Sequence, residues 1–517
     1  MPDKTWPETE DGIAAREPGL GGRALEGSLW LLTGRIYRQV LFVGRAVVLG
    51  RLLTPRDFGL VGLGDLALMF LGVLSYTGFD EGLVQRPHLT PRVIHTAWWV
   101  ILGRSFLMGA TLWITAPRIA LLVQDPAATS IIRALALVQV LSGFTSMGVT
   151  LLGKDLQFRS ILKWEVSGVT LDLLVAITAA LIWRNAWALV LGAAAGALTR
   201  VIVSYTLHPY KPRFVFDLKA AWELFKFGRW LLFSSILYFA ISKGTDAVSG
   251  IIFGAASLGL YQMASRFALL PNYHFGETFQ LSLFPAYSKI QGDRARLTAA
   301  FLKVLQVACF IVFPLSAVMA VAVAPVLPLF LGSKWQAVVN LAPPLAVGGA
   351  LQALLRTGTP LFMATGKTRC QFAMDLASVA GIGLCIYPLS SLLGLEGLAW
   401  SYAGGIALGL PVWWRFVREQ VEAKSSELVL AIVPALLGSL LLAGTVWLPA
   451  KLFHLNFSQW GALGPMAVLV LLGGAAYLAV IFIMERLMPG YQPLRASLNL
   501  LQAKWKKKGG EGPTAAF

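Results

Sequence analysis

Three arginines lie in one apolar, helix-length stretch near the start of the chain, residues 27–50. At 100° per residue, Arg35, Arg38 and Arg45 fall within an arc of about 80° on one face of an α-helix. A charge at the centre of a bilayer costs at least about 2.5–3.5 kcal/mol, so this face must meet water or protein instead of lipid. The pattern predicts a helix with lipid on one side and a wet cavity on the other.

Cations outnumber acids at membrane depth along the whole chain. Nine of the 43 lysines and arginines fall within apolar spans, where acids are fewer. Helix contacts alone would need balanced charges, so the excess predicts an anionic ligand. The cations proposed to meet that ligand are Arg35, Arg38, Arg45, Lys243, Arg266 and Arg356.

Each assignment has a simpler alternative. Arg35 and Arg38 either contact the ligand or pair with carboxylates, and Arg45 either faces the cavity or extends to the outer surface beyond Gly50. Asp65, Asp246 and Glu277 serve either in charge pairing or in binding a coupling cation. Asp246 follows Lys243 by three residues, and this spacing favours a pair on one helix face.

The elements that carry these residues are membrane helices. The chain has 517 residues, of which 56% are hydrophobic and 13% charged, and apolar runs continue to its end. This composition predicts an all-α polytopic membrane protein. The basic residues behind the net charge of +17 lie between apolar runs, which argues against a nucleic-acid partner. We expect about 14 spans: 27–50, 58–79, 93–115, 127–151, 161–183, 186–208, 227–252, 257–284, 299–323, 338–364, 370–392, 395–417, 427–449 and 461–485.

Basic residues also predict the orientation. With the N-terminus in the cytoplasm, 28 lysines and arginines fall in cytoplasmic segments and six in the opposite loops. This bias places both termini in the cytoplasm. Residues 1–26 form a polar cytoplasmic segment without the features of a signal peptide. The basic tail, 486–517, is expected to lie on anionic lipid headgroups.

Two stretches of the chain resemble two others. Residues 47–63 align with 251–264, with Gly50 opposite Gly254 and Gly59 near Gly259, and residues 151–158 resemble 363–372. We therefore expect two six-helix lobes, 27–208 and 227–418, related by a pseudo-two-fold axis along the membrane normal. A cytoplasmic linker, 209–226, joins the lobes, and two additional helices occupy 427–485.

Residues for catalysis or metal binding are missing from the sequence pattern. The five histidines are scattered without metal spacing, and no Gly-rich phosphate loop ends in Lys and Ser or Thr. The three cysteines lie in or beside apolar segments without paired spacing. We expect no enzyme activity and no cofactor, with Na⁺, H⁺ or the membrane potential as candidates for coupling.

Several short motifs run in order over residues 27–418: RLLTPRDFGL (51–60), GFDEGLVQR (78–86), LGLYQMASRFALLP (258–271), LFLGSKW (329–335) and ATGKTR (364–369). With them the chain resembles the polysaccharide transporter family, flippases of lipid-linked oligosaccharides in the multidrug/oligosaccharidyl-lipid/polysaccharide superfamily. The resemblance implies two lobes around a cavity, alternating access, and a bacterial cytoplasmic membrane. Fourteen spans depart from the twelve typical of sugar-lipid exporters.

The resemblance also implies a substrate, a polyprenyl-diphosphate-linked oligosaccharide. The six cations above would then hold the diphosphate, for which guanidinium forks are well suited. Trp30, Tyr261 and Tyr273 are candidates for stacking on sugars. Membrane lipids, a polysaccharide polymerase and glycosyltransferases are the other expected partners. The alternatives are a multidrug cation antiporter of the same superfamily and a membrane enzyme of the same pathway, such as a polymerase or ligase.

Overall fold

The structure is a computed structural model that describes residues 20–75, 90–155, 157–215, 217–452, 461, 463–488 and 490–497. Side chains are described for these residues except 20–33, 35–36, 218–234 and 274–282. The described part of the chain is helical and contains no strand, so the predicted all-α class is confirmed.

The helices follow one another with short connections. In chain order they are α1 (Leu20–Leu52), α2 (Pro55–Leu74), α4 (Pro91–Leu122), α5 (Ala127–Ser142), α6 (Gly148–Lys154), α7 (Phe158–Trp183), α8 (Trp187–Leu207), α9 (Leu218–Ala268), α10 (Leu270–Ile290), α11 (Arg294–Val318), the π-helical turn η1 (Met319–Val323), α12 (Ala324–Leu331), the 3₁₀ turn η2 (Ser333–Trp335), α13 (Val338–Arg356), α14 (Gly358–Ala364), α15 (Thr368–Gln420), α16 (Ser425–Leu452) and α17 (Leu463–Leu487).

Ten helical segments of the described chain are long and apolar enough to cross a membrane. The finer count of fourteen spans stays a prediction. Two of the long helices, α9 and α15, are each interrupted by one glycine, Gly254 at φ 82° and Gly394 at φ 60°. Glycine adopts such positive φ angles without steric cost, so each helix can reverse there. The first turns of α9 also cover the second half of the predicted linker, 209–226.

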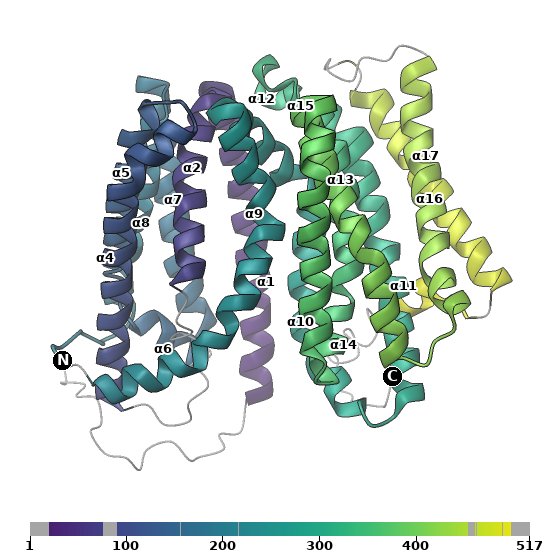
Figure 1. Ribbon diagram of the computed structural model, residues 1–517, viewed down its shortest axis with the longest axis horizontal. Coiled ribbons are helices and arrows are strands. Elements are labelled where there is room, and N and C mark those ends of the chain that lie inside the picture. The colour runs from purple at the N-terminus through teal and green to yellow at the C-terminus, as the bar shows by residue number, and fades with distance from the viewer. Residues whose placement is uncertain are drawn as a thin grey trace.

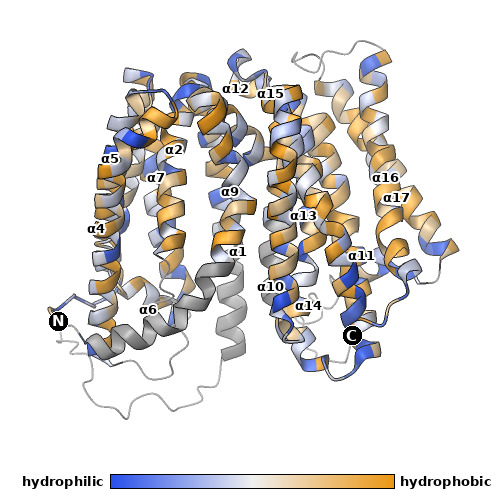
Figure 2. Cartoon of the chain, viewed as in Figure 1, coloured by the Kyte–Doolittle hydropathy of each residue, from blue (hydrophilic) through white to orange (hydrophobic). Residues whose placement is uncertain are grey.

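The helices form two groups that lie beside each other (Figure 1). One group contains α1, α2 and α4–α8, and the other contains α10–α15. The long helix α9 passes between them and packs on α2 as well as on α13 and α15. Helices α16 and α17 lie at the far edge, where α16 packs on α11. Most of the coloured helical residues are apolar (Figure 2), as expected for a bundle in lipid.

The backbones of α2 and α9 approach each other very closely. A Cβ atom added at Gly59 would lie 1.6 Å from the carbonyl oxygen of Ala255, and one added at Gly259 would lie 1.9 Å from the carbonyl oxygen of Pro55. Only glycine permits backbones to approach this closely. The contact is reciprocal, since each glycine meets the residue four positions before the other.

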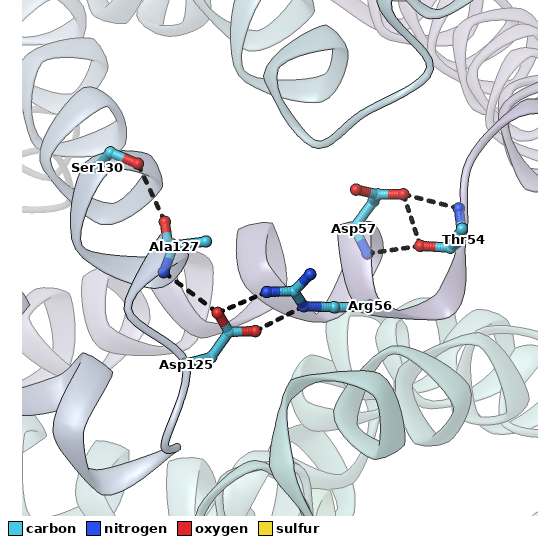
Figure 3. Close-up of polar contacts among 6 residues, drawn as sticks. All are labelled: Thr54, Arg56, Asp57, Asp125, Ala127 and Ser130. Atoms are coloured by element: carbon cyan, nitrogen blue, oxygen red, sulfur yellow. Dashed lines mark hydrogen bonds and ion pairs between the residues drawn. The ribbon is translucent and has the colours of Figure 1, made fainter.

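The start of α2 is held by polar contacts (Figure 3). Thr54 and Asp57 form a capping box, and Pro55 occupies the first turn. Nε and Nη2 of Arg56 donate to the two carboxylate oxygens of Asp125, at 2.7 and 2.8 Å. Asp125 also accepts from the backbone amide of Ala127. This guanidinium lowers the pKa of the Asp125 carboxyl. The pair fixes α2 to the turn between α4 and α5. We call this end of the bundle, where α1 ends and α2 begins, the upper end.

Candidate functional site

The arginine face of α1 lies against α7. Arg38 approaches Glu165 at 3.3 Å, and Arg45 pairs with Asp172 at 2.7 Å. Both pairs join residues 127 positions apart, and both partners advance by seven residues. A constant offset means that α1 and α7 run in the same direction, and a spacing of seven is two helical turns. We call these two ion pairs the α1–α7 seam. The side chain of Arg35 lies outside the described residues.

Both arginines have a carboxylate partner in the seam: Arg38 pairs with Glu165, which is one of the two alternatives left open for it by the sequence, and Arg45 pairs with Asp172. Both side chains stay partly exposed, so these pairs leave the prediction of a wet cavity on this face untested. Asp172 also has Arg200 among its electrostatic neighbours. A role of Arg38 or Arg45 in binding substrate stays a prediction.

A larger set of charges shares Arg45 and Asp172 with the seam and comes from α1, α2, α7 and α9. We call it the central charge cluster. Lys243 donates to Asp246 at 3.0 Å, as the three-residue spacing predicts. Arg266 has Arg45, Asp65 and Asp246 as electrostatic neighbours. The cluster therefore contains as many acids as cations. Its members are Arg45, Asp65, Asp172, Lys243, Asp246 and Arg266.

Asp65 is the exposed acid of this cluster. It lies in the middle of α2, a helix composed mostly of apolar residues, and it is exposed. Its electrostatic neighbours come from α1, α7 and α9: Arg45, Asp172, Lys243 and Arg266. A carboxylate in this position, surrounded by charges from several helices, faces water and not lipid.

Two of the predicted cations have no ion pair among the described residues, Arg266 and Arg356. The Arg266 guanidinium lies 5.5 Å from the ring centre of Phe42, and that of Arg356 lies 5.1 Å from the ring centre of Tyr238. One terminal nitrogen of Arg356 is buried and makes no hydrogen bond to a described residue. An aromatic ring attracts a cation weakly and leaves the edge of the guanidinium fork available to an anion.

The aromatic candidates differ in access. Tyr273 is 37% exposed and has Lys243 and Asp246 as electrostatic neighbours. Tyr261 is completely buried and has no surface for a sugar in this conformation. The side chains of Trp30 and Glu277 lie outside the described residues. Among the described residues, no group of three or more His, Cys, Asp or Glu side chains is placed to hold a metal ion.

Sequence reasoning missed several residues of the site. It did not identify Glu165 and Asp172 as partners of the arginines, although the shared spacing of seven residues was visible in the sequence. It also missed Phe42 and Tyr238, the rings beside Arg266 and Arg356. No spacing connects either ring with its arginine, because Phe42 and Arg266 come from different helices and Tyr238 and Arg356 are far apart along the chain.

Solved structures with a similar fold include a flippase and a multidrug transporter. A lipid II flippase MurJ in an inward closed conformation superposes with a TM-score of 0.66, at 14% identity, over 89% of this chain and 99% of that one. An inward-facing multidrug resistance transporter of the MATE family in the MOP superfamily gives 0.55, at 17% identity, over 74% and 94%. At these identities the likeness establishes the fold alone. The described residues include ten helices that are long and apolar enough to cross a membrane, so the chain is a multi-pass integral membrane protein.

Sequence relatives agree with this fold. The chain is 25% identical over 458 residues to the succinoglycan biosynthesis transport protein ExoT of Rhizobium meliloti (strain 1021), covering 88% of this chain and 91% of that protein. It is 24% identical over 356 residues to the lipopolysaccharide biosynthesis protein WzxC of Escherichia coli (strain K12), covering 68% and 72%. The teichuronic acid biosynthesis protein TuaB of Bacillus subtilis (strain 168) is 25% identical over 390 residues, covering 75% and 80%. Residues 48–340 match the family described as "Polysaccharide biosynthesis protein", and the chain belongs to this family.

Proposed function

We propose that the protein is a flippase that moves a polyprenyl-diphosphate-linked oligosaccharide from the cytoplasmic to the outer leaflet for synthesis of a cell-surface polysaccharide. The family, the relatives in succinoglycan, lipopolysaccharide and teichuronic acid synthesis, and the flippase fold support this function. The protein acts as a transporter and not as an enzyme.

One observation carries the assignment of the site. Arg266 and Arg356 are the two predicted cations that rest on aromatic rings and lack an ion pair within the described chain. A diphosphate offers several acceptor oxygens, which match two guanidinium forks. Arg356 lies over the exposed ring of Tyr238, and the exposed Tyr273 has Tyr238, Lys243 and Asp246 as electrostatic neighbours. Both rings present apolar faces on which sugars can stack. In this arrangement Lys243 and Arg45 contribute charge at longer range through the central charge cluster.

Alternating access needs two lobes that move relative to each other. The reciprocal glycine contact between α2 and α9 supports a division of the chain into two such lobes. Adding 200 to a residue number in α2 gives the equivalent position in α9: Gly59 is equivalent to Gly259, and Pro55 to Ala255. Gly59 then contacts the equivalent of Pro55, and Gly259 contacts Pro55 itself. Gly62 likewise lies against its own counterpart, Gln262. Self-complementary contacts of this kind arise at a two-fold axis. We place a pseudo-two-fold axis here, between lobes 27–208 and 227–418, with the helices of 427–485 added to the second lobe.

The orientation follows from the distribution of Lys and Arg. The upper end then faces away from the cytoplasm, and both termini lie in the cytoplasm of a bacterial cell whose inner membrane holds the protein. The energy source is Na⁺, H⁺ or the membrane potential. Asp65 is the candidate for coupling, because it is exposed and has no ion pair among the described residues.

A multidrug cation antiporter is the second candidate function. The neutral balance of the central charge cluster favours it, since acids there could hold a cationic drug. It predicts binding of hydrophobic cations that is lost in the Asp65→Asn variant. The flippase predicts no such binding.

The test uses proteoliposomes that contain the purified protein and a fluorescent polyprenyl-diphosphate oligosaccharide. A membrane-impermeant quencher reports how fast the labelled lipid changes leaflet. We expect the wild type to accelerate this exchange, the Arg266→Ala variant to lose the acceleration, and a monophosphate analogue to move more slowly. Equal rates with and without protein would refute the function.

A further inference from the structure

Two segments from different parts of the chain cap each other at the upper end. Arg51, at the end of α1, donates from Nε to the carbonyl oxygen of Phe330 at 2.7 Å and from a terminal nitrogen to that of Leu329. In return, Lys334 donates to the carbonyl oxygen of Arg51 at 2.9 Å, and the indole of Trp335 donates to that of Gly50 at 2.9 Å.

These contacts satisfy the ends of two helices. The last carbonyl groups of a helix have no partner within it and carry partial negative charge, so they attract cations and donors. Here α12 ends on the guanidinium of Arg51, and α1 ends on the donors of Lys334 and Trp335. The ring of Trp335 is fully buried and meets that of Phe58 edge-on at 5.3 Å. We call residues 50–58 and 329–335 with these contacts the upper latch.

The second segment is attached through bends. Between α11 and α12 the chain forms the π-helical turn Met319–Val323, and Pro325 and Pro328 follow within α12. Beyond α12, Gly332 has a φ of 103°. A π-helical turn and prolines weaken the regular hydrogen bonding of a helix and allow it to bend. The part of the latch on α12 can therefore move relative to α11.

Only one side of the proposed axis has this feature in the described chain. The α2–α9 contacts give an offset of 200, in place of the 204 between Gly50 and Gly254 in the sequence alignment. With this offset Arg51 and Leu52 correspond to Ile251 and Ile252, which are 51% and 59% exposed. Isoleucine has no hydrogen-bond donor in its side chain and cannot cap a helix. The latch is therefore an addition to the symmetric packing of α2 on α9 and not a consequence of it.

We propose that the upper latch holds the upper end closed, and that its release, with bending at Met319–Val323, opens this end for exit of the transported molecule. The proposal rests on the proposed function for what passes through. The closing itself is a property of the protein alone. Two motifs noted in the sequence, RLLTPRDFGL and LFLGSKW, obtain a role through their contact with each other.

The experiment measures the separation of the two groups of helices without substrate. Spin labels replace exposed residues near the upper end, Arg118→Cys and Ala337→Cys, in a protein without native cysteines, held in lipid nanodiscs. Electron–electron double resonance gives the distance distribution. We expect Arg51→Leu with Trp335→Phe to increase the fraction of longer distances about tenfold, which corresponds to about 1.4 kcal/mol. Trp335→Phe keeps a ring against Phe58 and removes only the indole donor and some volume.

The control is Asp125→Asn, which breaks an ion pair at the same end but within one group of helices. This variant should keep the wild-type distribution. A latch variant that elutes as folded protein and gives the control's distribution would overturn the proposal.

A second measurement excludes a folding defect as the cause of the change. In an unlabelled protein without native cysteines, the pair Arg51→Cys and Lys334→Cys, oxidised to a disulfide, should stop leaflet exchange, and a reductant should restore it. Exchange that continues at the wild-type rate with the disulfide formed would overturn the latch. A latch that responds as expected in a protein without flippase activity would instead refute the proposed function alone.

Discussion

Arginines have different partners in two regions of the molecule, the α1–α7 seam and the surroundings of Arg266 and Arg356. In the seam, Arg38 and Arg45 meet carboxylates supplied by a parallel neighbouring helix. Arg266 and Arg356 instead lie over the rings of Phe42 and Tyr238 and have no ion pair within the described chain. Under the proposed function, the first region holds helices together and the second binds the anionic diphosphate.

This difference has a physical cause. A carboxylate satisfies the charge and the hydrogen-bond donors of a guanidinium together, and a phosphate must compete with it. A ring satisfies only part of the charge and none of the donors along the edge of the fork. A count of cations along the sequence therefore overestimates how many of them are available to a ligand.

The largest expected effect comes from Arg266. Replacing it by alanine should reduce export at least about tenfold, because charge-assisted hydrogen bonds contribute about 1.5–3 kcal/mol each. Surface polysaccharide in a strain that lacks the wild-type gene measures the effect at matched protein levels. Arg118→Ala, at an exposed arginine near the upper end, is the control. Export at the wild-type level with Arg266→Ala would remove this residue from the site.

The seam should respond in stability more than in transport. Arg45→Leu leaves Asp172 without its ion-pair partner, and leaving one member of this half-buried pair alone costs about 1–3 kcal/mol. The double variant Arg45→Leu with Asp172→Leu should recover much of that loss, since no buried charge is left alone. Thermal unfolding in detergent measures both. No recovery in the double variant would mean that Arg45 has another partner.

Arg38 can distinguish an arginine that only holds α1 on α7 from one that contacts the substrate. Exchanging the charges, Arg38→Glu with Glu165→Arg, keeps the pair but moves the guanidinium to α7. A residue of the seam should tolerate the exchange, with a change in stability of about 0–1 kcal/mol because the side chain of Arg38 is 45% exposed. Export should remain. Its loss in a stable protein would place Arg38 among the residues that contact the substrate.

The smallest effect concerns pH and the Arg56–Asp125 pair at the upper end. Arg56 lowers the pKa of Asp125, so the pair stabilises the fold above the carboxyl's unfolded pKa, about 3.9. The contribution disappears as the pH falls through the lower, folded value. The difference in melting temperature between wild type and Asp125→Asn should be small at pH 7 and shrink below about pH 4. A difference that grows on acidification would contradict this sign.

The sequence was sufficient to name many residues of the candidate site. It predicted less of how these residues are arranged in space. The pairing of Lys243 with Asp246 was predictable because residues three apart share a helix face. The placement of Arg45, Lys243 and Arg266 in one cluster followed from their similar depth in membrane helices. The burial of Tyr261 and the exposure of Tyr238 were not predictable, since both depend on which neighbouring helix covers them.

The amino-acid sequence alone identifies an all-α membrane protein and the charged residues that fall within its apolar spans. These properties follow from the cost of exposing backbone and charge to lipid, which each segment must meet on its own. The tertiary structure decided which arginines have partners, because an ion pair between α1 and α7 depends on their direction and register. It also brought Arg51 to Phe330 and Gly59 to Ala255, contacts between distant segments that local patterns do not encode.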